Sequence, residues 1–151
     1  MYFETTNSTL GPLTLFAAAN NIIALEFGSV AKNKPTPILK EAITQLKAYF
    51  NCQLTHFNLP IKTSGTDFQQ AVWDHILKIP YGTTLSYGAL AQKLKSTPRA
   101  IGAACGKNPI PIIIPCHRVL AANYKIGGFS VGDGISTKAS LLRIEGINRK
   151  L

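Results

Sequence analysis

The stretch from residue 112 to residue 120 constrains this chain more than any other. Three isoleucines precede Pro115, and Cys116, His117 and Arg118 follow it directly. A short apolar run that meets a proline predicts a buried strand that stops or bends there. Cys116 would then lie at the end of a rigid element, aimed into a cleft, and cysteine is a strong nucleophile once ionised. The alternative is that Cys116 is a small buried hydrophobe without reactivity.

Composition limits the classes of protein that remain. The 151 residues suffice for one compact unit or two small ones, and 46% of them are hydrophobic, enough for a core. No apolar run is long enough for a membrane helix, and the N-terminus lacks a signal-peptide pattern. The three cysteines include no Cys-x-x-Cys pair, which argues against a disulfide framework and a zinc finger. We therefore expect a reduced compartment and predict a cytoplasmic location.

The balance of charge indicates a polyanionic partner. Sixteen lysines and arginines oppose seven aspartates and glutamates, which gives a net charge of +9. Such an excess favours nucleic acid, and a basic surface that merely keeps the protein in solution is the alternative. The basic residues are spread through the second half, up to Arg149 and Lys150, rather than gathered in a tail. This spread predicts a folded basic face.

The first half of the chain has the pattern of a scaffold. Residues 1–28 predict a small β-meander, because short apolar segments are separated by turn clusters. An amphipathic helix is predicted from Pro37, since apolar residues recur there at helical spacing. Neither a catalytic constellation nor a metal site is indicated. A polar linker places the boundary near Ser64, so we predict a scaffold domain over residues 1–64 and a second domain over residues 65–151.

Two short helices joined by a tight turn are predicted in the second domain. Thr84 or Ser86 can cap the first, and Thr97 can cap the second, with Pro98 at its first position. This pair predicts a helix-turn-helix. A longer helix is predicted before the pair, with Phe68 on its apolar face.

The second helix of the pair, over residues 98–106, has an unusual outer face. By helical spacing, Arg99 shares this face with Gly102, Ala103 and Gly106. A reader of the major groove needs long polar side chains there, whereas a smooth helix suits the minor groove, which is only about 6 Å wide. We predict sequence-independent docking in the minor groove, with Arg99 as the long probe. The alternative is that the small residues pack closely against another helix of the protein.

A glycine-rich loop and a last helix close the chain. Residues 127–134 lack the lysine and the helix context of a phosphate-binding loop, so we predict a close-fitting pocket wall. Ser136 or Thr137 would cap a helix over residues 138–145. Glu145 lies at the unfavourable end of that helix for a carboxylate, which indicates either a functional contact or an exposed surface residue.

The string Pro115-Cys116-His117-Arg118, together with the segments around it, resembles the active-site motif of the O6-alkylguanine-DNA alkyltransferases. The resemblance covers nearly all of residues 65–151. It implies an α+β fold: a small ribonuclease H-like domain of β-meander plus helix, then a mainly helical domain of the winged or helix-turn-helix type with a short strand before the active-site cysteine.

The implied activity is DNA repair by direct reversal of damage. The alkyl group of O6-alkylguanine, or of O4-alkylthymine, in double-stranded DNA would move irreversibly to Cys116, once per molecule, after the nucleotide flips out of the duplex. No cofactor is implied, because the DNA itself supplies the alkyl group. The partner would be alkylated duplex DNA, bound by a monomer without contact to a membrane.

The resemblance also implies roles for individual residues. His117 would act with Glu145 on the acceptor Cys116. Asn108 would brace the active-site turn, and Tyr87 would protonate or hydrogen-bond the leaving base. The implied DNA-binding residues are Arg99, Thr97, Gly102, Ala103, Gly106, Lys107 and Arg118. The implied pocket residues are Val119, Phe129, Ser130 and Cys105.

The chain departs from the family pattern in three places. Phe129 stands where tyrosine is usual, which keeps stacking and loses a hydroxyl. Residues 131–134 differ from the common pattern, which bears on the tolerance for larger alkyl groups, and the zinc ligands of some members are missing. Three alternatives remain: a non-catalytic lesion sensor, which Cys116 argues against, a DNA-binding regulator, and a cysteine hydrolase.

Overall fold

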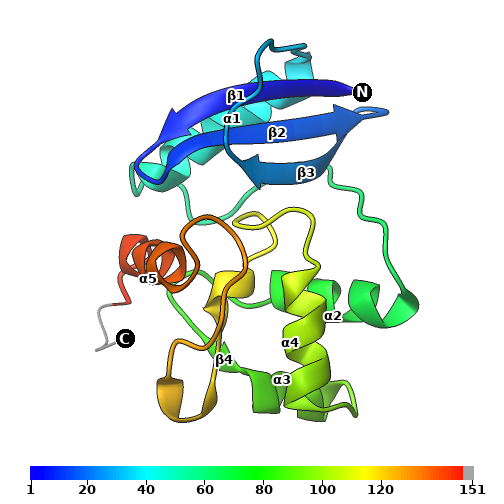
Figure 1. The fold of residues 1–151 in the computed structure, drawn as a ribbon, viewed down its shortest axis with the longest axis vertical. Coiled ribbons are helices and arrows are strands. Elements are labelled where there is room, and N and C mark those ends of the chain that lie inside the picture. Colours follow the sequence, from blue (N-terminus) through cyan, green and yellow to red (C-terminus); the bar gives the residue numbers. More distant parts are fainter. Residues whose placement is uncertain (148–151) are drawn as a thin grey trace. The chain divides into compact units, whose positions relative to one another are not determined.

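The computed structural model describes residues 1–147, so Arg149 and Lys150 of the predicted basic face lie outside the described residues. The chain divides into two compact units, Met1–Thr63 and Ser64–Leu151 (Figure 1). The first unit is a sheet with one helix, and the second is mainly helical, which confirms the predicted α+β class. Within the described range no helix is long and apolar enough to cross a membrane.

The first unit is a three-stranded antiparallel sheet in the order β1-β2-β3, with helix α1 packed on it (Figure 1). The elements are β1 (Tyr2–Ser8), β2 (Gly11–Ala18), β3 (Asn21–Phe27) and α1 (Pro37–Phe50). The Thr36 hydroxyl accepts a hydrogen bond from the Leu39 amide and so caps α1. Leu13 and Leu15 of β2 and the apolar face of α1 are buried and form the core of this unit. The predicted meander and helix are confirmed.

The second unit begins with helix α2 (Asp67–Leu77), which a capping box of Thr66 and Gln69 starts. Phe68 was predicted on its apolar face, but 36% of that residue is exposed, so the prediction is wrong. Trp73 is buried in its place, and its indole Nε1 donates a hydrogen bond of 3.0 Å to the carbonyl of Ala104. An indole buries a larger apolar area than a phenyl ring and needs a partner for its N–H.

The predicted helix-turn-helix is present. Helix α3 (Tyr87–Lys93) follows the short strand β4 (Leu85–Ser86), and α4 (Pro98–Gly106) follows α3. The Ser86 hydroxyl accepts from the Ala89 amide and caps α3, while the Thr97 hydroxyl accepts from the Ala100 amide and caps α4. Contacts with α2 and α3 hold α4 on its inner side.

The strand predicted before Cys116 is absent, which is a correction. Residues 110–114 form a buried turn, in which the Ile114 amide donates to the Ile110 carbonyl and Ile112 has a φ of 75°. A strand cannot contain that φ, and prolines at both ends of the run remove donors that a ladder would need. Cys116 instead begins a single 3-10 turn, η1 (Cys116–Arg118), and the strand β5 (Val119–Leu120) comes after it, parallel to β4.

The chain then passes through a 3-10 turn, η2 (Ala122–Tyr124), and the glycine-rich loop to helix α5 (Ile135–Ile144). The predicted start of this helix at residue 138 is wrong. Gly134 precedes it with a φ of 64° and no side-chain cap, and the Thr137 hydroxyl inside the helix accepts from the Asp133 amide. Glycine tolerates that φ, so the loop can turn into the helix without a capping hydroxyl.

Candidate active site

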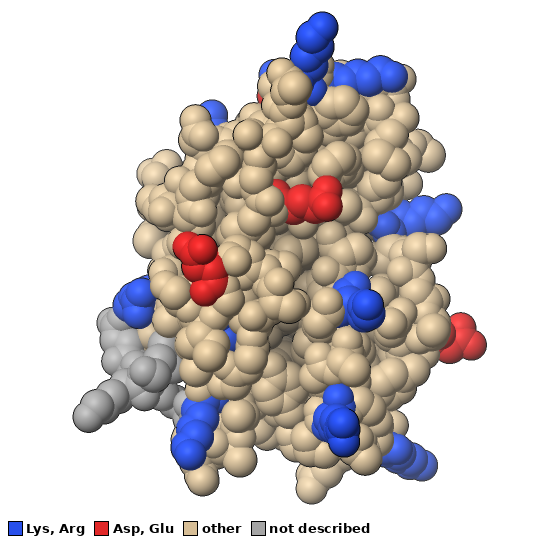
Figure 2. All heavy atoms as spheres, viewed as in Figure 1, with Lys and Arg blue, Asp and Glu red and all other residues tan. Residues whose placement is uncertain are grey.

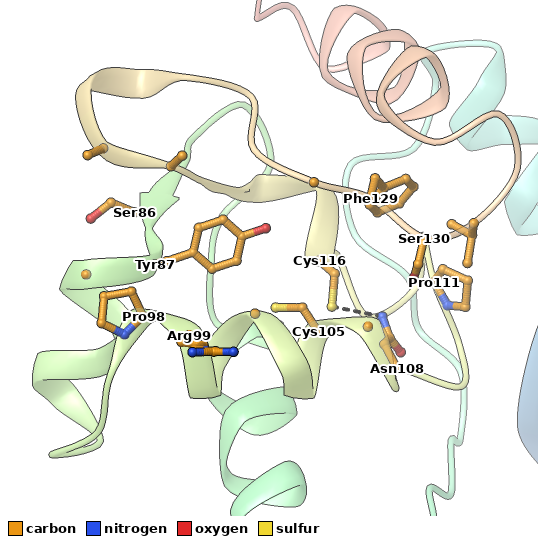
Figure 3. A pocket seen from close by; sticks show the side chains of 17 residues that line it. Ser86, Tyr87, Pro98, Arg99, Cys105, Asn108, Pro111, Cys116, Phe129 and Ser130 are labelled. Atoms are coloured by element: carbon orange, nitrogen blue, oxygen red, sulfur yellow. Dashed lines mark hydrogen bonds between the residues drawn. The ribbon is translucent and has the colours of Figure 1, made fainter.

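A pocket of about 670 Å³ lies in the second unit and opens beside α4 (Figure 3). Its walls come from α3, α4, η1 and the glycine-rich loop. Most of the predicted site residues meet here: Tyr87, Arg99, Gly102, Cys105, Gly106, Asn108, Cys116, Phe129 and Ser130. The size and the mixture of apolar walls with a few polar groups are typical of a small-molecule or nucleobase site.

Cys116 is held at the pocket by Asn108. The Asn108 amide nitrogen donates to the Cys116 sulfur over 3.0 Å and to the Ile114 carbonyl over 2.9 Å. Its amide oxygen accepts from the Ile110 amide over 2.9 Å. One side chain therefore spans the buried turn and offers a donor to the sulfur, which favours the thiolate form of Cys116.

A second thiol lies against the first. Cys105 on α4 lines the same pocket as Cys116, and a hydrogen bond between the two thiols is the first cause of the pKa shift of each. This hydrogen bond, and then burial, raise the pKa of Cys116. The same hydrogen bond lowers the pKa of Cys105, and the charge of Lys138 acts in the same direction. Cys105, one of the pocket residues that the resemblance implies, lies in the lining of this pocket.

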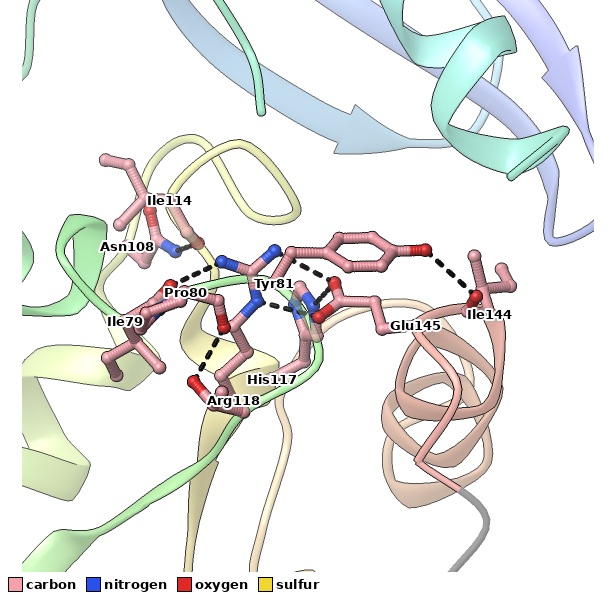
Figure 4. A network of polar contacts seen from close by, with 10 residues as sticks. Ile79, Pro80, Tyr81, Asn108, Ile114, His117, Arg118, Ile144 and Glu145 are labelled. Atoms are coloured by element: carbon pink, nitrogen blue, oxygen red, sulfur yellow. Dashed lines mark hydrogen bonds and ion pairs between the residues drawn. The ribbon is translucent and has the colours of Figure 1, made fainter. Parts of the chain in front are cut away.

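His117, Arg118 and Glu145 form a buried network behind the pocket (Figure 4). His117 Nε2 and Arg118 Nε both contact the Glu145 carboxylate, Arg118 over 2.7 Å. Burial lowers the pKa of His117, while Glu145 opposes the shift. His117 Nδ1 is buried and has no hydrogen-bond partner among the described residues. Glu145 ends α5 in this network, so of the two interpretations of Glu145 the exposed surface residue is wrong.

Arg118 does not face outward. Only 7% of the residue is exposed, and its remaining guanidinium nitrogens donate to Glu145 over 3.2 Å and to the Ile79 carbonyl over 2.6 Å. The guanidinium also lies 5.7 Å from the centre of the Tyr81 ring. The prediction that Arg118 contacts DNA is therefore wrong, because the side chain is buried and each of its three guanidinium nitrogens donates inside the protein.

Lys138 is a site residue that we did not predict from the sequence. It is fully buried in α5, and its Nζ donates to the Val119 carbonyl over 2.7 Å, to the Gly128 carbonyl over 3.2 Å and to the Tyr87 hydroxyl over 3.4 Å. Burial lowers the pKa of Lys138 to about 8, against the raising effect of the two cysteines. The sequence does contain a signal for this role. Lys138, Leu141 and Glu145 are spaced as i, i+3 and i+7, which places all three on one side of a helix, and that side is buried.

Tyr87 faces the two thiols from the first position of α3 (Figure 3). Burial raises the pKa of Tyr87 to about 12, with smaller effects of Cys105 and Cys116, so the hydroxyl keeps its proton at neutral pH. Gly127 allows the loop to approach the ring: a Cβ at Gly127 would lie 3.1 Å from the ring carbon Cε2. The hydroxyl is thus a donor held at the pocket wall.

The outer face of α4 is open. A Cβ built on Gly102 would have no neighbour within 4 Å among the residues that the structure describes. Thr97, Arg99, Ala103 and Lys107 are exposed along the same helix and its ends. The alternative that the small residues pack against another helix of this chain is therefore wrong for the described part. Figure 2 shows lysine and arginine side chains scattered over one face rather than gathered in one patch.

Val119 is fully buried, is not among the residues that line the pocket, and accepts a hydrogen bond from Lys138 at its carbonyl, so its predicted place in the pocket stays a prediction. Phe129 and Ser130 line the pocket from the glycine-rich loop. No group of three or more possible metal ligands occurs within residues 1–147.

Two family descriptions match the sequence. Residues 67–147 match the DNA-binding domain of 6-O-methylguanine DNA methyltransferase, and residues 1–63 match the ribonuclease-like domain of the same family. A Methylated-DNA--protein-cysteine methyltransferase of Mycobacterium tuberculosis is 42% identical over 96% of this chain and 92% of that protein. One of Methanosarcina acetivorans is 36% identical over 97% of this chain and 99% of that protein.

Solved structures agree with these matches. The crystal structure of Mycobacterium tuberculosis OGT in complex with DNA superposes with a TM-score of 0.86 at 42% identity, over 96% of this chain and 92% of that chain. An O6-Methylguanine DNA Methyltransferase from Methanococcus jannaschii superposes with a TM-score of 0.68 at 30% identity, over 100% of this chain and 96% of that chain.

Proposed function

This chain belongs to the 6-O-methylguanine DNA methyltransferase family, and we propose that it repairs alkylated duplex DNA by moving the alkyl group of O6-alkylguanine to Cys116. One observation supports this most directly. The Cys116 sulfur and the Tyr87 hydroxyl face the same pocket, directly beside the open, small-residue face of α4. A nucleophile and a proton donor are thus arranged around a space that a flipped base can enter.

The chemical step is a single displacement. The Cys116 thiolate attacks the alkyl carbon, a carbon–sulfur bond forms, and the bond from that carbon to O6 breaks. The electron pair stays with guanine, which takes a proton from the Tyr87 hydroxyl. Lys138 lies 3.4 Å from this hydroxyl, so its ammonium can stabilise the charge left on Tyr87. The product is a thioether, and no group near it can cleave that bond, so each molecule acts once and needs no cofactor.

Cys116 must lose its proton before it attacks, and we assign that proton to His117. The imidazole is held neutral by burial, and its Nδ1 has no partner among the described residues, so it can accept a proton. No hydrogen bond joins His117 to Cys116 within residues 1–147, so one water between Nδ1 and the sulfur completes the path. Glu145 stabilises the imidazolium that results, and Asn108 stabilises the thiolate.

Helix α4 supplies the DNA-binding surface. A helix without bulky side chains on its outer face can enter the minor groove, and the Mycobacterium tuberculosis relative was solved with DNA. Arg99 stands at the mouth of the pocket on this helix and is the side chain that takes the place of the flipped nucleotide. Thr97 and Lys107 at the two ends of α4 are placed to contact phosphates.

We place the protein in the cytoplasm, as a monomer before it meets DNA. Cys105 and Cys116 are free thiols. A protein that is consumed at a thiol needs a compartment in which that thiol stays reduced.

Intact mass after mixing with a duplex that carries O6-methylguanine tests the proposal. One methyl group should appear per molecule, and none on Cys116→Ala. The circular dichroism spectrum of Cys116→Ala should match that of the parent protein, which shows that the variant is folded. Tight binding of the duplex without any change in mass would show a lesion sensor and would reject the transfer reaction together with the roles given to His117 and Tyr87.

A further inference from the structure

We propose that Cys105 and Cys116 are also an oxidation site for hydroperoxides, at which they join in a reversible disulfide that shields the acceptor sulfur. This chemistry goes beyond alkyl transfer and needs no DNA. It uses a thiol, Cys105, to which the proposed repair reaction gives no task.

The position of the pair is the first support. Cys105 comes from α4 and Cys116 from η1, so two separate elements bring their sulfurs to one pocket (Figure 3). Each of the two thiols shifts the pKa of the other, so the two groups interact. Because both side chains line the same pocket, a covalent bond between the sulfurs can form inside it.

The surroundings of the pair make it reactive. Cys105 is partly exposed in a pocket of about 670 Å³, so a small peroxide can reach it, whereas only 4% of Cys116 is exposed. The hydrogen bond from Cys116 lowers the pKa of Cys105, and the nearby Lys138 charge acts in the same direction. A partly exposed thiolate beside a cation is the form of cysteine that peroxides oxidise, and a neighbouring thiol resolves the product.

The reaction balances in two steps. The Cys105 sulfur attacks one oxygen of the hydroperoxide, the O–O bond breaks, and a sulfenic acid forms while water or an alcohol leaves. The Cys116 sulfur then displaces the hydroxyl of the sulfenic acid, which leaves as water, and the S–S bond forms. The two sulfurs together lose two electrons, the two peroxide oxygens gain them, and the protein loses two hydrogen atoms.

The disulfide has two consequences for the site. The acceptor sulfur is blocked, so the oxidised protein cannot take an alkyl group. The same bond prevents further oxidation of Cys116 to a sulfinic acid, which cells rarely reverse, whereas thiols reduce a disulfide readily. Oxidation therefore pauses repair without destroying the molecule.

The experiment uses the whole protein, hydrogen peroxide, and intact mass after the remaining thiols are blocked with iodoacetamide. When denatured, the reduced protein should carry three blocked thiols and the oxidised protein should carry one. A peptide map of the oxidised protein should show Cys105 joined to Cys116. Cys52→Ser should carry none after oxidation, since Cys52 is exposed and lies in the other unit. Dithiothreitol should then restore methyl acceptance by the parent and by Cys52→Ser.

Cys105→Ser and Cys105→Ala keep Cys52 and Cys116, so they should carry two blocked thiols after the same treatment and should not lose two hydrogens. The proposal is wrong if the parent protein gains oxygen without an S–S bond, or if the map joins Cys52 to either pocket cysteine. All of these outcomes are read from protein and peptide masses, so they do not depend on methyl transfer. A parent that forms the disulfide but never accepts a methyl group would reject the repair function and leave the oxidation site standing.

Discussion

At the scale of single residues, the carboxylate of Glu145 contacts two basic side chains. Arg118 and His117 both contact it in a buried position, and the guanidinium of Arg118 compensates its charge. A buried charge that loses its partner is strongly destabilising, whereas a complete pair is nearly neutral. We infer that Arg118 positions Glu145, and through it His117, and that its value for repair is indirect.

Arg118→Met should therefore lower the free energy of unfolding by about 3–5 kcal/mol, because it leaves the Glu145 carboxylate buried without its main cation. Urea titration at neutral pH measures the change. Arg143→Met is the matched control, since Arg143 is exposed in α5 and its loss should change stability by no more than about 0.5 kcal/mol. A small loss of stability together with weaker DNA binding would instead restore Arg118 as a DNA contact.

Lys138→Met should slow methyl transfer by about 100-fold, because the charge beside Tyr87 and the thiols disappears. Single-turnover kinetics with an O6-methylguanine duplex measure the rate, and Lys125→Met, an exposed lysine, is the control. Binding of undamaged duplex should be the same for both variants, since Lys138 is buried. An unchanged transfer rate would confine Lys138 to holding the Val119 and Gly128 carbonyls.

At the scale of elements, helix α4 combines a buried inner side with a bare outer side. Ile101 and Ala104 are buried, while a Cβ at Gly102 would meet no atom of residues 1–147 within 4 Å. A glycine inside a helix lowers stability relative to alanine, so its presence in α4 has a cost that folding alone does not explain. The close approach to the DNA groove that we propose for α4 would explain it.

Gly102→Ala should raise the free energy of unfolding by about 1 kcal/mol, since the added methyl meets no neighbour and improves helix propensity. Gly102→Leu should be nearly as stable and yet bind duplex DNA at least tenfold more weakly, because its side chain would stand between α4 and the groove. Chemical denaturation and fluorescence anisotropy separate the two effects. Equal DNA affinity for the alanine and leucine variants would contradict minor-groove docking by this face.

The elements that were predictable have local signals. Thr36, Ser86 and Thr97 each cap a helix that the sequence predicts, and periodic apolar residues complete it. The turn at residues 110–114 was not predictable, because its isoleucines are as apolar as those of a strand and only the tertiary fold decides between the two. Cys116 stood out through its neighbours, whereas the roles of Lys138 and Arg118 depend on burial, which sequence spacing does not reveal.

At the scale of the whole molecule, the buried imidazole of His117 makes the free energy of unfolding depend on pH. The pKa of His117 is lowered below its ordinary 6.5, chiefly by burial. Below pH 6.5 the unfolded chain binds a proton at His117 that the folded protein does not bind, so stability falls as the pH falls. The slope from this group cannot exceed about 1.4 kcal/mol per pH unit.

His117→Gln should flatten this dependence, because glutamine keeps a donor for Glu145 and does not titrate. Urea unfolding of both proteins from pH 7 to pH 5 gives the two curves, and their difference isolates His117, since all other groups are shared. The parent should lose more stability than the variant on acidification. Parallel curves would mean that the pKa of His117 is the same in the folded and the unfolded protein.

Trp73 gives the molecule its own optical reporter. It is the chain's single tryptophan, 2% of it is exposed, and its indole N–H donates to the Ala104 carbonyl, one residue before Cys105 in α4. Indole emission depends on polarity and hydrogen bonding around the ring. Any shift of α4 when DNA docks, when Cys116 is alkylated, or when the two sulfurs join will therefore change the fluorescence of an unlabelled protein, and the three events can be followed in real time.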